Sequence, residues 1–211
     1  MTYRFIFVLL AFCVTACSPV QPRQRLSFKD LRDANVVKQA EDFSCGAAAL
    51  ATLATYGLDH PVSEREVLDA AFAGLDAKQK YQREHYGLSL LDLQRVAEKL
   101  GFSAAGFKLK PENLSLLRRP VIVFIKTNDE DHFSVLRGVS GNRVLLADPS
   151  LGNVRMTMYK FLDMWLDPAS GQGIVFPLEP AGHVWPPSSP LDVHGPTMRP
   201  EAVAAHQMIF N

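Results

Sequence analysis

Residues 39–57 read QAEDFSCGAAALATLATYG, and this stretch decides how the rest of the chain is interpreted. Cys45 and Gly46 are followed by small apolar residues of high helix propensity, so we predict a loop that becomes a buried helix at the cysteine. We expect this helix to end at Gly57, which can adopt a left-handed conformation. A helix N-terminus offers unpaired N–H groups and partial positive charge, which favour a thiolate. Cys45 is therefore a candidate nucleophile, and a cysteine that only packs a helix is an equally good interpretation of this stretch alone.

The composition is that of one ordinary globular domain. The chain has 211 residues, enough for a substantial core, and its 22 Lys and Arg balance its 22 Asp and Glu. Because there is no basic excess, we expect no nucleic-acid partner. The six histidines form no HxxxH pair and the cysteines no CxxC pair, so we expect neither a metal ion nor another cofactor.

Residues 1–17 have the build of a bacterial export signal, with one arginine before the apolar run FIFVLLAFCV. The signal ends in VTAC, which resembles a lipobox, so we predict lipidation of Cys17 and anchoring to the outer membrane from the periplasmic side. The alternative is cleavage after Ala16 and a soluble periplasmic protein. Cys13 also lies in the signal, which leaves Cys45 as the single cysteine of the domain and excludes a disulfide framework there.

Polar and proline-containing segments flank the predicted domain. We expect residues 18–30 to form a tether, residues 31–178 to form the domain, and residues 179–211 to form an extended or disordered tail. Half of the chain's 14 prolines lie between Pro177 and Pro200.

The first half of the domain is predicted to be helical. After a short strand or extended segment within residues 30–43, Ser63 begins a capping box and a helix, and Ser89 begins a further helix that ends at Gly101. Residues 75–87 are charged and loosely patterned, so we predict a surface loop there.

The second half is predicted to consist of strands. Residues 102–109 suggest a first strand, and VIVFIK at 121–126 is typical of a central strand buried on both faces. Residues 132–139 and 143–149 form a β-hairpin, and GIVFPL at 173–178 is predicted to be the last strand. Helices followed by antiparallel strands indicate an α+β domain.

The same hairpin carries the groups that a nucleophilic cysteine needs. His132 begins its first strand and Asp148 ends its second, so the two lie within about two residues of direct opposition. A carboxylate at that position can fix the tautomer of the imidazole. Separately, a histidine at a strand end and an Asp-Pro turn have ordinary explanations.

Gln39 lies six residues before Cys45. Its amide and the backbone N–H of Cys45 can together stabilise an oxyanion. From the residues alone, a surface glutamine is the preferred interpretation.

Four segments together resemble the C39 peptidases, which are papain-like cysteine peptidases known best as domains of bacteriocin-exporting ABC transporters. The segments are Gln39, Ser44–Leu50, Asp131–Val135 and Leu146–Pro149. The resemblance extends over about residues 36–178. It implies a papain-like fold in which an N-terminal helical lobe packs on an antiparallel β-sheet lobe.

The resemblance also implies roles for individual residues. Cys45 is implied to be the nucleophile and His132 the general base and acid. Asp148 is implied to orient the histidine, and Gln39 to donate to the oxyanion. Many family members have Asp where this chain has Ser44.

No transmembrane bundle and no GxxxxGK[ST] nucleotide loop accompany the predicted domain, so ATP is not an expected ligand. The chain therefore resembles the stand-alone exported C39-like proteins of Gram-negative bacteria, one of which belongs to the Fap functional-amyloid secretion system.

The leading hypothesis is a periplasmic cysteine peptidase that cleaves an exported protein or peptide, with secretion-system components as possible partners. The alternatives are a non-hydrolytic peptide-binding module of a secretion system and papain-like chemistry on another acyl substrate. Tyr81, His85 and Tyr86 are candidate walls of a cleft, although ordinary surface positions are the preferred interpretation.

Overall fold

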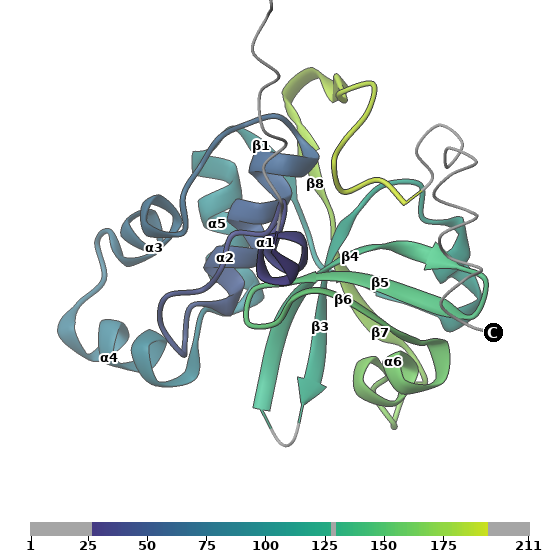
Figure 1. Ribbon diagram of the computed structural model, residues 1–211. Coiled ribbons are helices and arrows are strands. Elements are labelled where there is room, and N and C mark those ends of the chain that lie inside the picture. The colour runs from purple at the N-terminus through teal and green to yellow at the C-terminus, as the bar shows by residue number, and fades with distance from the viewer. Residues whose placement is uncertain (1–26, 128–129, 194–211) are drawn as a thin grey trace, which may run out of the picture.

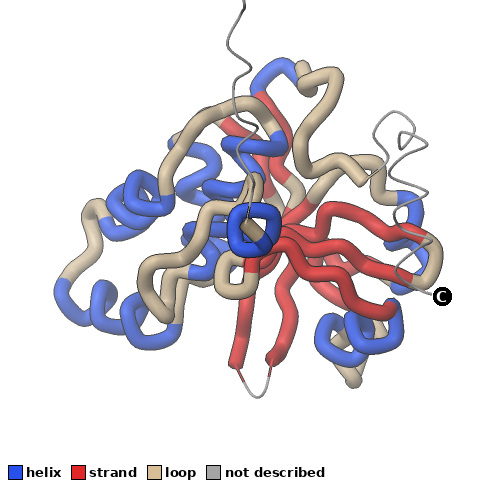
Figure 2. The backbone as a smooth tube through the Cα atoms, in the orientation of Figure 1, coloured by secondary structure: helices blue, strands red, loops and turns tan. Residues whose placement is uncertain are grey.

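The computed structural model describes residues 27–127 and 130–193 (Figure 1). The predicted signal peptide, Cys17 and residues 18–26 of the predicted tether lie outside these residues, whereas residues 28–30 of that tether are helical. The helices of the first half gather on one side of the molecule and the strands on the other (Figure 2).

The helical half contains five α-helices and one π-helical turn. They are α1 (Phe28–Asp33), α2 (Cys45–Thr52) with its continuation η1 (Leu53–Gly57), α3 (Glu64–Phe72), α4 (Ala77–Tyr86) and α5 (Leu90–Lys99). Reciprocal capping boxes begin α1, α3, α4 and α5, so the side chain at the cap and the side chain three residues later satisfy free backbone N–H groups. The helices predicted at Ser63 and Ser89 are confirmed. Among residues 27–127 and 130–193, no helix is long and apolar enough to cross a membrane.

The predicted surface loop at residues 75–87 is wrong, because α4 occupies this segment. None of its residues is buried, so the helix has no apolar face that the sequence pattern would have revealed. Instead, Asp76 accepts a hydrogen bond from the Gln79 backbone, and the Gln79 side chain accepts one from Asp76 in return. Gly87, with φ +78°, ends the helix.

The end of the cysteine helix also differs from the prediction. The chain widens into a π-helical turn over Leu53–Gly57, and Gly57 does not adopt the left-handed conformation expected of it. A Cβ at Gly57 would come within 2.8 Å of the Leu53 side chain, so this glycine permits close packing rather than a change in chain direction.

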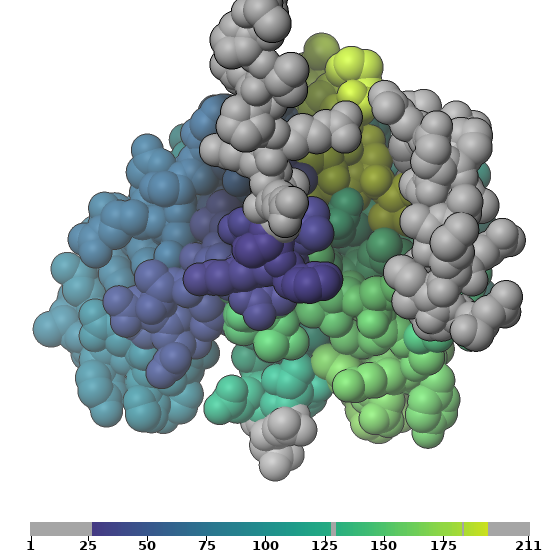
Figure 3. Space-filling view, in the orientation of Figure 1, coloured from purple at the N-terminus to yellow at the C-terminus, as the bar shows by residue number. Residues whose placement is uncertain are grey.

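The segment before the cysteine helix begins with α1 rather than with a strand. Helix α1 lies across the front of the molecule, between the helical half and the sheet (Figure 3). Gly152 allows this approach, since a Cβ there would come within 2.6 Å of the Arg32 carbonyl oxygen and its φ is +84°. Asn153 donates from its side chain to the carbonyls of Arg32 and Ala34 at 3.0 and 2.7 Å.

The sheet half is antiparallel, as predicted, with six strands in the order β2-β7-β3-β4-β5-β6 and a separate pair β1-β8. The strands are β1 (Phe102–Ala104), β2 (Phe107–Leu109), β3 (Val121–Thr127), β4 (Glu130–Ser140), β5 (Arg143–Asp148), β6 (Gly152–Thr157), β7 (Gly173–Phe176) and β8 (Leu178–Pro180). The single strand predicted over 102–109 is therefore wrong, because β1 and β2 belong to different sheets. The remaining elements are the 3-10 turns η2 (Pro111–Leu116) and η3 (Ala181–His183) and the helix α6 (Met158–Trp165).

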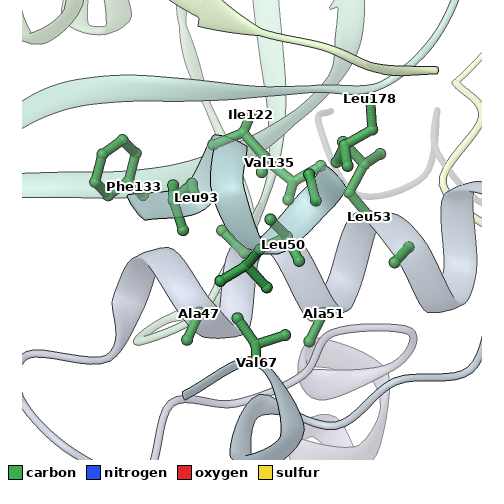
Figure 4. Close-up of a cluster of buried hydrophobic side chains, with 14 of the residues drawn as sticks. Ala47, Leu50, Ala51, Leu53, Val67, Leu93, Ile122, Phe133, Val135 and Leu178 are labelled. Atoms are coloured by element: carbon green, nitrogen blue, oxygen red, sulfur yellow. The ribbon is translucent and has the colours of Figure 1, made fainter. Parts of the chain in front are cut away.

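Strand β3 is buried on both faces, as predicted. Ile122 faces the core shared with the helical half, while Val123 and Ile125 face a second core covered by α6. In Figure 4, Leu50 of α2 lies between Val67 on one side and the sheet residue Ile122 on the other. The cysteine helix is thus enclosed by α3 and by the sheet.

The chain after residue 178 is more ordered than the predicted tail. Residues 184–193, which we call the C-terminal strap, contact both halves of the molecule. Ser189 donates from its hydroxyl to the Tyr56 carbonyl at 2.7 Å, and Leu191 is fully buried in the core of the helical half. Residues 194–211 of the predicted tail lie outside the described chain.

Arg137 of β4 fixes the C-terminal strap to the sheet. Its guanidinium donates to the carbonyls of Leu191 and Pro190 at 3.1 and 2.9 Å, and to the side chain of Asn153 at 2.7 Å. Because Asn153 also binds the loop after α1, one arginine connects the strap, the sheet and the first helix.

We predict that Leu191→Ala lowers the free energy of unfolding by about 2–5 kcal/mol, because it opens a cavity in the core. Denaturant unfolding measures this change, and Leu116→Ala is a matched control, since Leu116 is 63% exposed. Equally small changes in the free energy of unfolding for both variants would contradict the conclusion that the C-terminal strap is part of the core.

Candidate active site

Cys45 is the first residue of α2 and is 9% exposed. The preceding Ser44 is fully buried, but its hydroxyl donates to the Glu41 carbonyl at 2.7 Å and does not cap the helix. No side chain caps the first turn of α2, so its N–H groups point from the helix start without a side-chain partner. The electrostatic field of these groups favours negative charge at this position.

His132 and Asp148 come together on the predicted hairpin. Val135 pairs with Ala147, and continuing this register sets Asp148 opposite Ser134, two positions from His132. The His132 Nε2 lies 2.8 Å from Asp148 Oδ2. The predicted placement on one hairpin is therefore confirmed.

Cys45 lies close enough to His132 for its side chain to stabilise the charged imidazole. Because Nε2 of the ring faces Asp148, Nδ1 is the nitrogen left for the sulfur. Burial disfavours the charged imidazole, but the hydrogen bonds to Asp148 and Cys45 outweigh this effect and raise the pKa of His132 to about 9. The histidine is thus set to hold a proton between a carboxylate and a sulfur.

Asp148 is held by several donors besides the histidine. Burial alone would raise its pKa, but the hydrogen bond and charge of His132, with smaller contributions from the Leu151 backbone and the Ser134 hydroxyl, lower it. The backbone N–H groups of Ser150 and Leu151 donate to Oδ1, both at 2.9 Å. The carboxylate is therefore fixed in orientation and charged.

A close helix–strand contact brings the cysteine to the histidine. Gly46 comes directly after Cys45, and Phe133 comes directly after His132. Gly46 and Phe133 pack against each other. A Cβ at Gly46 would lie 3.1 Å from Phe133 Cδ2, which is tighter than an ordinary contact. Glycine at position 46 therefore lets the helix start lie directly against β4.

Gln39 lies beside the aspartate turn. Its backbone N–H donates to the Pro149 carbonyl at 3.1 Å, and its Oε1 accepts from the Ser150 hydroxyl at 2.7 Å. Its Nε2 donates to the Glu41 carbonyl at 3.0 Å, with a longer bond of 3.4 Å to that of Asp42. Gln39 thus bridges the loop that precedes Cys45 and the turn that follows Asp148.

A cleft of about 730 Å³ opens beside the cysteine, between the loop and helix of the helical half and the β3–β4 hairpin. Phe124, Phe133 and Ile174 contribute apolar surface from the sheet. His85 and Tyr86 line the opposite wall, so the preferred interpretation of these two as ordinary surface residues is wrong. Tyr81 does not line the cleft, but its ring stacks on His85 with centroids 5.8 Å apart.

Two residues that support the aspartate, Ser134 and Ser150, are not predicted from the sequence. The Asp148-Pro149-Ser150 run was recognised as a turn, and an aspartate that accepts from the backbone two residues later is the usual interaction in such a turn. Ser134 gave no signal, because a buried serine on an apolar strand has no distinctive pattern.

The fold and the site together define the class as a papain-like α+β domain, in which a cysteine at a helix start meets a histidine and an aspartate from a sheet. Residues 33–169 match the peptidase C39 family, and the chain belongs to this family.

Two curated relatives bear the description probable functional amyloid protease FapD. The chain is 34% identical over 154 residues to the one from Pseudomonas aeruginosa, a match that covers 73% of this chain and 64% of that protein. It is 38% identical over 152 residues to the one from Pseudomonas fluorescens, covering 71% and 62%. The match thus spans less than two thirds of the length of either relative.

Solved structures agree with the fold. The peptidase domain of Streptococcus ComA, a bi-functional ABC transporter involved in a quorum sensing pathway, superposes with a TM-score of 0.55 at 25% identity, covering 69% of this chain and 97% of that domain. A double glycine motif protease from an AMS/PCAT transporter, solved with its leader peptide, has a TM-score of 0.50 at 24% identity, covering 69% and 90%. The helical lobe and antiparallel sheet predicted from the resemblance are confirmed.

We predict that the His132 ring titrates with a midpoint near pH 9 by NMR, because both of its partners favour the imidazolium. Asp148→Asn removes one negative partner and Cys45→Ala removes the other, so each variant is expected to move the midpoint to lower pH. A wild-type midpoint near 6.5, the value of an unperturbed histidine, would contradict this geometry.

Proposed function

We propose that the protein is a cysteine peptidase in which Cys45 is the nucleophile, His132 the general base and acid, and Asp148 the orienting carboxylate. The single observation that carries this proposal is that His132 interacts both with Asp148, whose Oδ2 lies 2.8 Å from its Nε2, and with Cys45, which helps to raise the pKa of the ring. Nucleophile, base and orienter within hydrogen-bond reach form the arrangement that activates a thiol for acyl transfer.

Because both partners of His132 favour its imidazolium, Nδ1 already holds the proton of the Cys45 thiol when substrate binds, and in the acylation step the sulfur attacks the carbonyl carbon of a peptide bond as a thiolate. The C=O π electrons move to the oxygen and form a tetrahedral oxyanion. When this intermediate collapses, the C–N bond breaks and the imidazolium gives its proton to the leaving amine. A thioester between Cys45 and the acyl part of the substrate remains.

In the deacylation step, His132 removes a proton from water, and the hydroxide formed attacks the thioester carbonyl. Collapse expels the sulfur as a thiolate beside the imidazolium, and the carboxylic acid product leaves. Asp148 keeps Nε2 protonated through both steps, because its carboxylate, held by fixed backbone donors, accepts a hydrogen bond from that nitrogen.

The oxyanion is proposed to be stabilised by the backbone N–H of Cys45 and by Gln39. The Nε2 of Gln39 carries two hydrogens; the bond to the Glu41 carbonyl at 3.0 Å uses one, and the oxyanion would take the other from the longer bond to the Asp42 carbonyl at 3.4 Å. Ser150 holds the amide oxygen, so the amide is fixed before substrate binds. Preorganised donors of this kind stabilise a transition state without being reoriented during the reaction.

The substrate is proposed to be a protein or peptide that passes through the periplasm, with secretion-system components as partners. The matched relatives described as functional amyloid proteases support this choice. The export-signal pattern of residues 1–17 supports a periplasmic location with Cys17 lipidated, followed by a tether that ends before the helix beginning at Phe28.

Cys45→Ala is predicted to abolish cleavage, with kcat/KM falling at least about a thousandfold, because the nucleophile is lost. Comparing the exported proteins of cells that carry wild type or this variant, by mass spectrometry of their termini, identifies the substrate. Unchanged processing in the variant would overturn the proposal. Specific binding of the same exported peptide by wild type, with no cleavage, would replace the peptidase with a peptide-binding module.

Gln39→Ala is predicted to lower kcat by about 100- to 1000-fold, the usual cost of one lost oxyanion donor. The rate at which iodoacetamide alkylates Cys45 is expected to stay near that of wild type, since alkylation forms no oxyanion. A parallel loss of both rates would mean that Gln39 only holds the loop in place.

A further inference from the structure

The cleft beside Cys45 carries acidic groups and no strong cation. The chain as a whole balances 22 Lys and Arg against 22 Asp and Glu, yet among the described residues no Lys or Arg lines the cleft. Its carboxylates are Asp42, Glu84, Glu130 and Asp131. A cleft lined by one sign of charge concentrates ligands of the opposite sign.

These carboxylates reach the cleft from three separate parts of the fold. Asp42 lies on the loop three residues before the nucleophile, and Glu84 lies on α4 across from the sheet. Glu130 and Asp131 lead directly into His132 on β4. The acidic groups therefore reach the cleft both from the helical half and from the sheet.

The four carboxylates have no ion-pair partner within the described residues. Arg83 precedes Glu84, but its guanidinium is turned to the buried Asp92 at 3.1 Å. Lys126 pairs with Asp131 in the strand register, but it is exposed and does not line the cleft. The negative charge of the cleft is thus available to a ligand.

The same cleft has aromatic and aliphatic walls that fit the stem of a long side chain. Tyr86 is 78% exposed and its ring meets His85 edge to face, with centroids 4.7 Å apart. Phe124 and Phe133 form a tilted pair on the opposite side, with centroids 5.2 Å apart. Lys and Arg side chains pack their methylene stems on such surfaces and carry their charge to the rim.

We propose that this cleft selects peptides with a Lys or Arg side chain close to the bond that is cleaved. The methylene stem of that side chain packs against the aromatic walls, and its charge lies among the carboxylates at the rim. This inference rests on the proposed peptidase function and names the substrate class of that site. Both parts of the cleft are required, because carboxylates alone bind any cation and apolar walls alone bind any apolar residue.

Fluorogenic peptides that differ only in the residue beside the scissile bond test this proposal, with Lys, Arg, Gln or Glu at that position. The other residues of each peptide are those that flank the cleavage site identified in the substrate by mass spectrometry. Wild type is expected to cleave the Lys and Arg peptides with kcat/KM about tenfold above the Gln peptide, and the Glu peptide most slowly. Added salt should reduce the Lys-to-Gln ratio, because the rim charges are exposed.

The double variant Glu84→Gln with Glu130→Gln is expected to bring the Lys-to-Gln ratio close to one. Glu112→Gln is the matched control, since Glu112 is exposed on η2 and does not line the cleft, and it should keep the wild-type ratio. Equal kcat/KM for all four peptides in wild type would overturn this inference while leaving the peptidase proposal intact. Absence of any cleavage, together with no labelling of Cys45 by an electrophilic peptide, would overturn the peptidase proposal itself.

Discussion

The direct contact between the start of α2 and strand β4 is the constraint on which the site depends. Gly46 and Phe133 make this contact, and each adjoins a member of the Cys45–His132 pair. Every residue of α2 is buried, so the helix is enclosed by α3 and the sheet, and a shift would disrupt close packing on several sides. The distance from sulfur to imidazole is therefore set by core packing and not by a mobile loop. Adding a methyl group at position 46 would push these two elements apart.

The charges of the site are stabilised by fixed hydrogen bonds. The side chains of His132 and Asp148 are only 14% and 5% exposed, so an isolated charge on either would be costly. Two backbone N–H groups and the histidine itself compensate the carboxylate, and this carboxylate and the sulfur compensate the imidazolium. This network of charged groups and hydrogen-bond donors is stable only when all of its members are present, because removal of one partner leaves a buried charge unpaired. The C-terminal strap and Arg137 hold the two halves together around this network from outside the cleft.

Much of the fold and of the site could be predicted from the sequence, wherever a pattern of a few neighbouring residues determines the local structure. The capping box at Ser63, the helix start at Ser89 and the hairpin that carries His132 and Asp148 are confirmed, since turn chemistry and apolar periodicity act over a few residues. Helix α4 was missed because a helix with no buried face leaves only its cap as a signal.

The order of the strap was missed for a different reason. A single buried Leu191 among prolines creates no periodicity, and its burial depends on contacts with residues more than 50 positions earlier. Gln39 gained its predicted role from the family resemblance, and the structure adds its contact with Ser150, which no spacing in the sequence reveals. Long-range contacts of this kind follow from the whole fold and not from any segment.

The central claim is that Cys45 is a nucleophile activated by His132. The most direct measurement is single-turnover acylation by a peptide that carries an electrophilic carbonyl, followed by mass mapping of the adduct, in wild type and in His132→Ala. Our account predicts one adduct per chain, located on Cys45, and a rate at least about a hundredfold lower in the variant. An adduct on another residue, or equal rates in the two proteins, would contradict it.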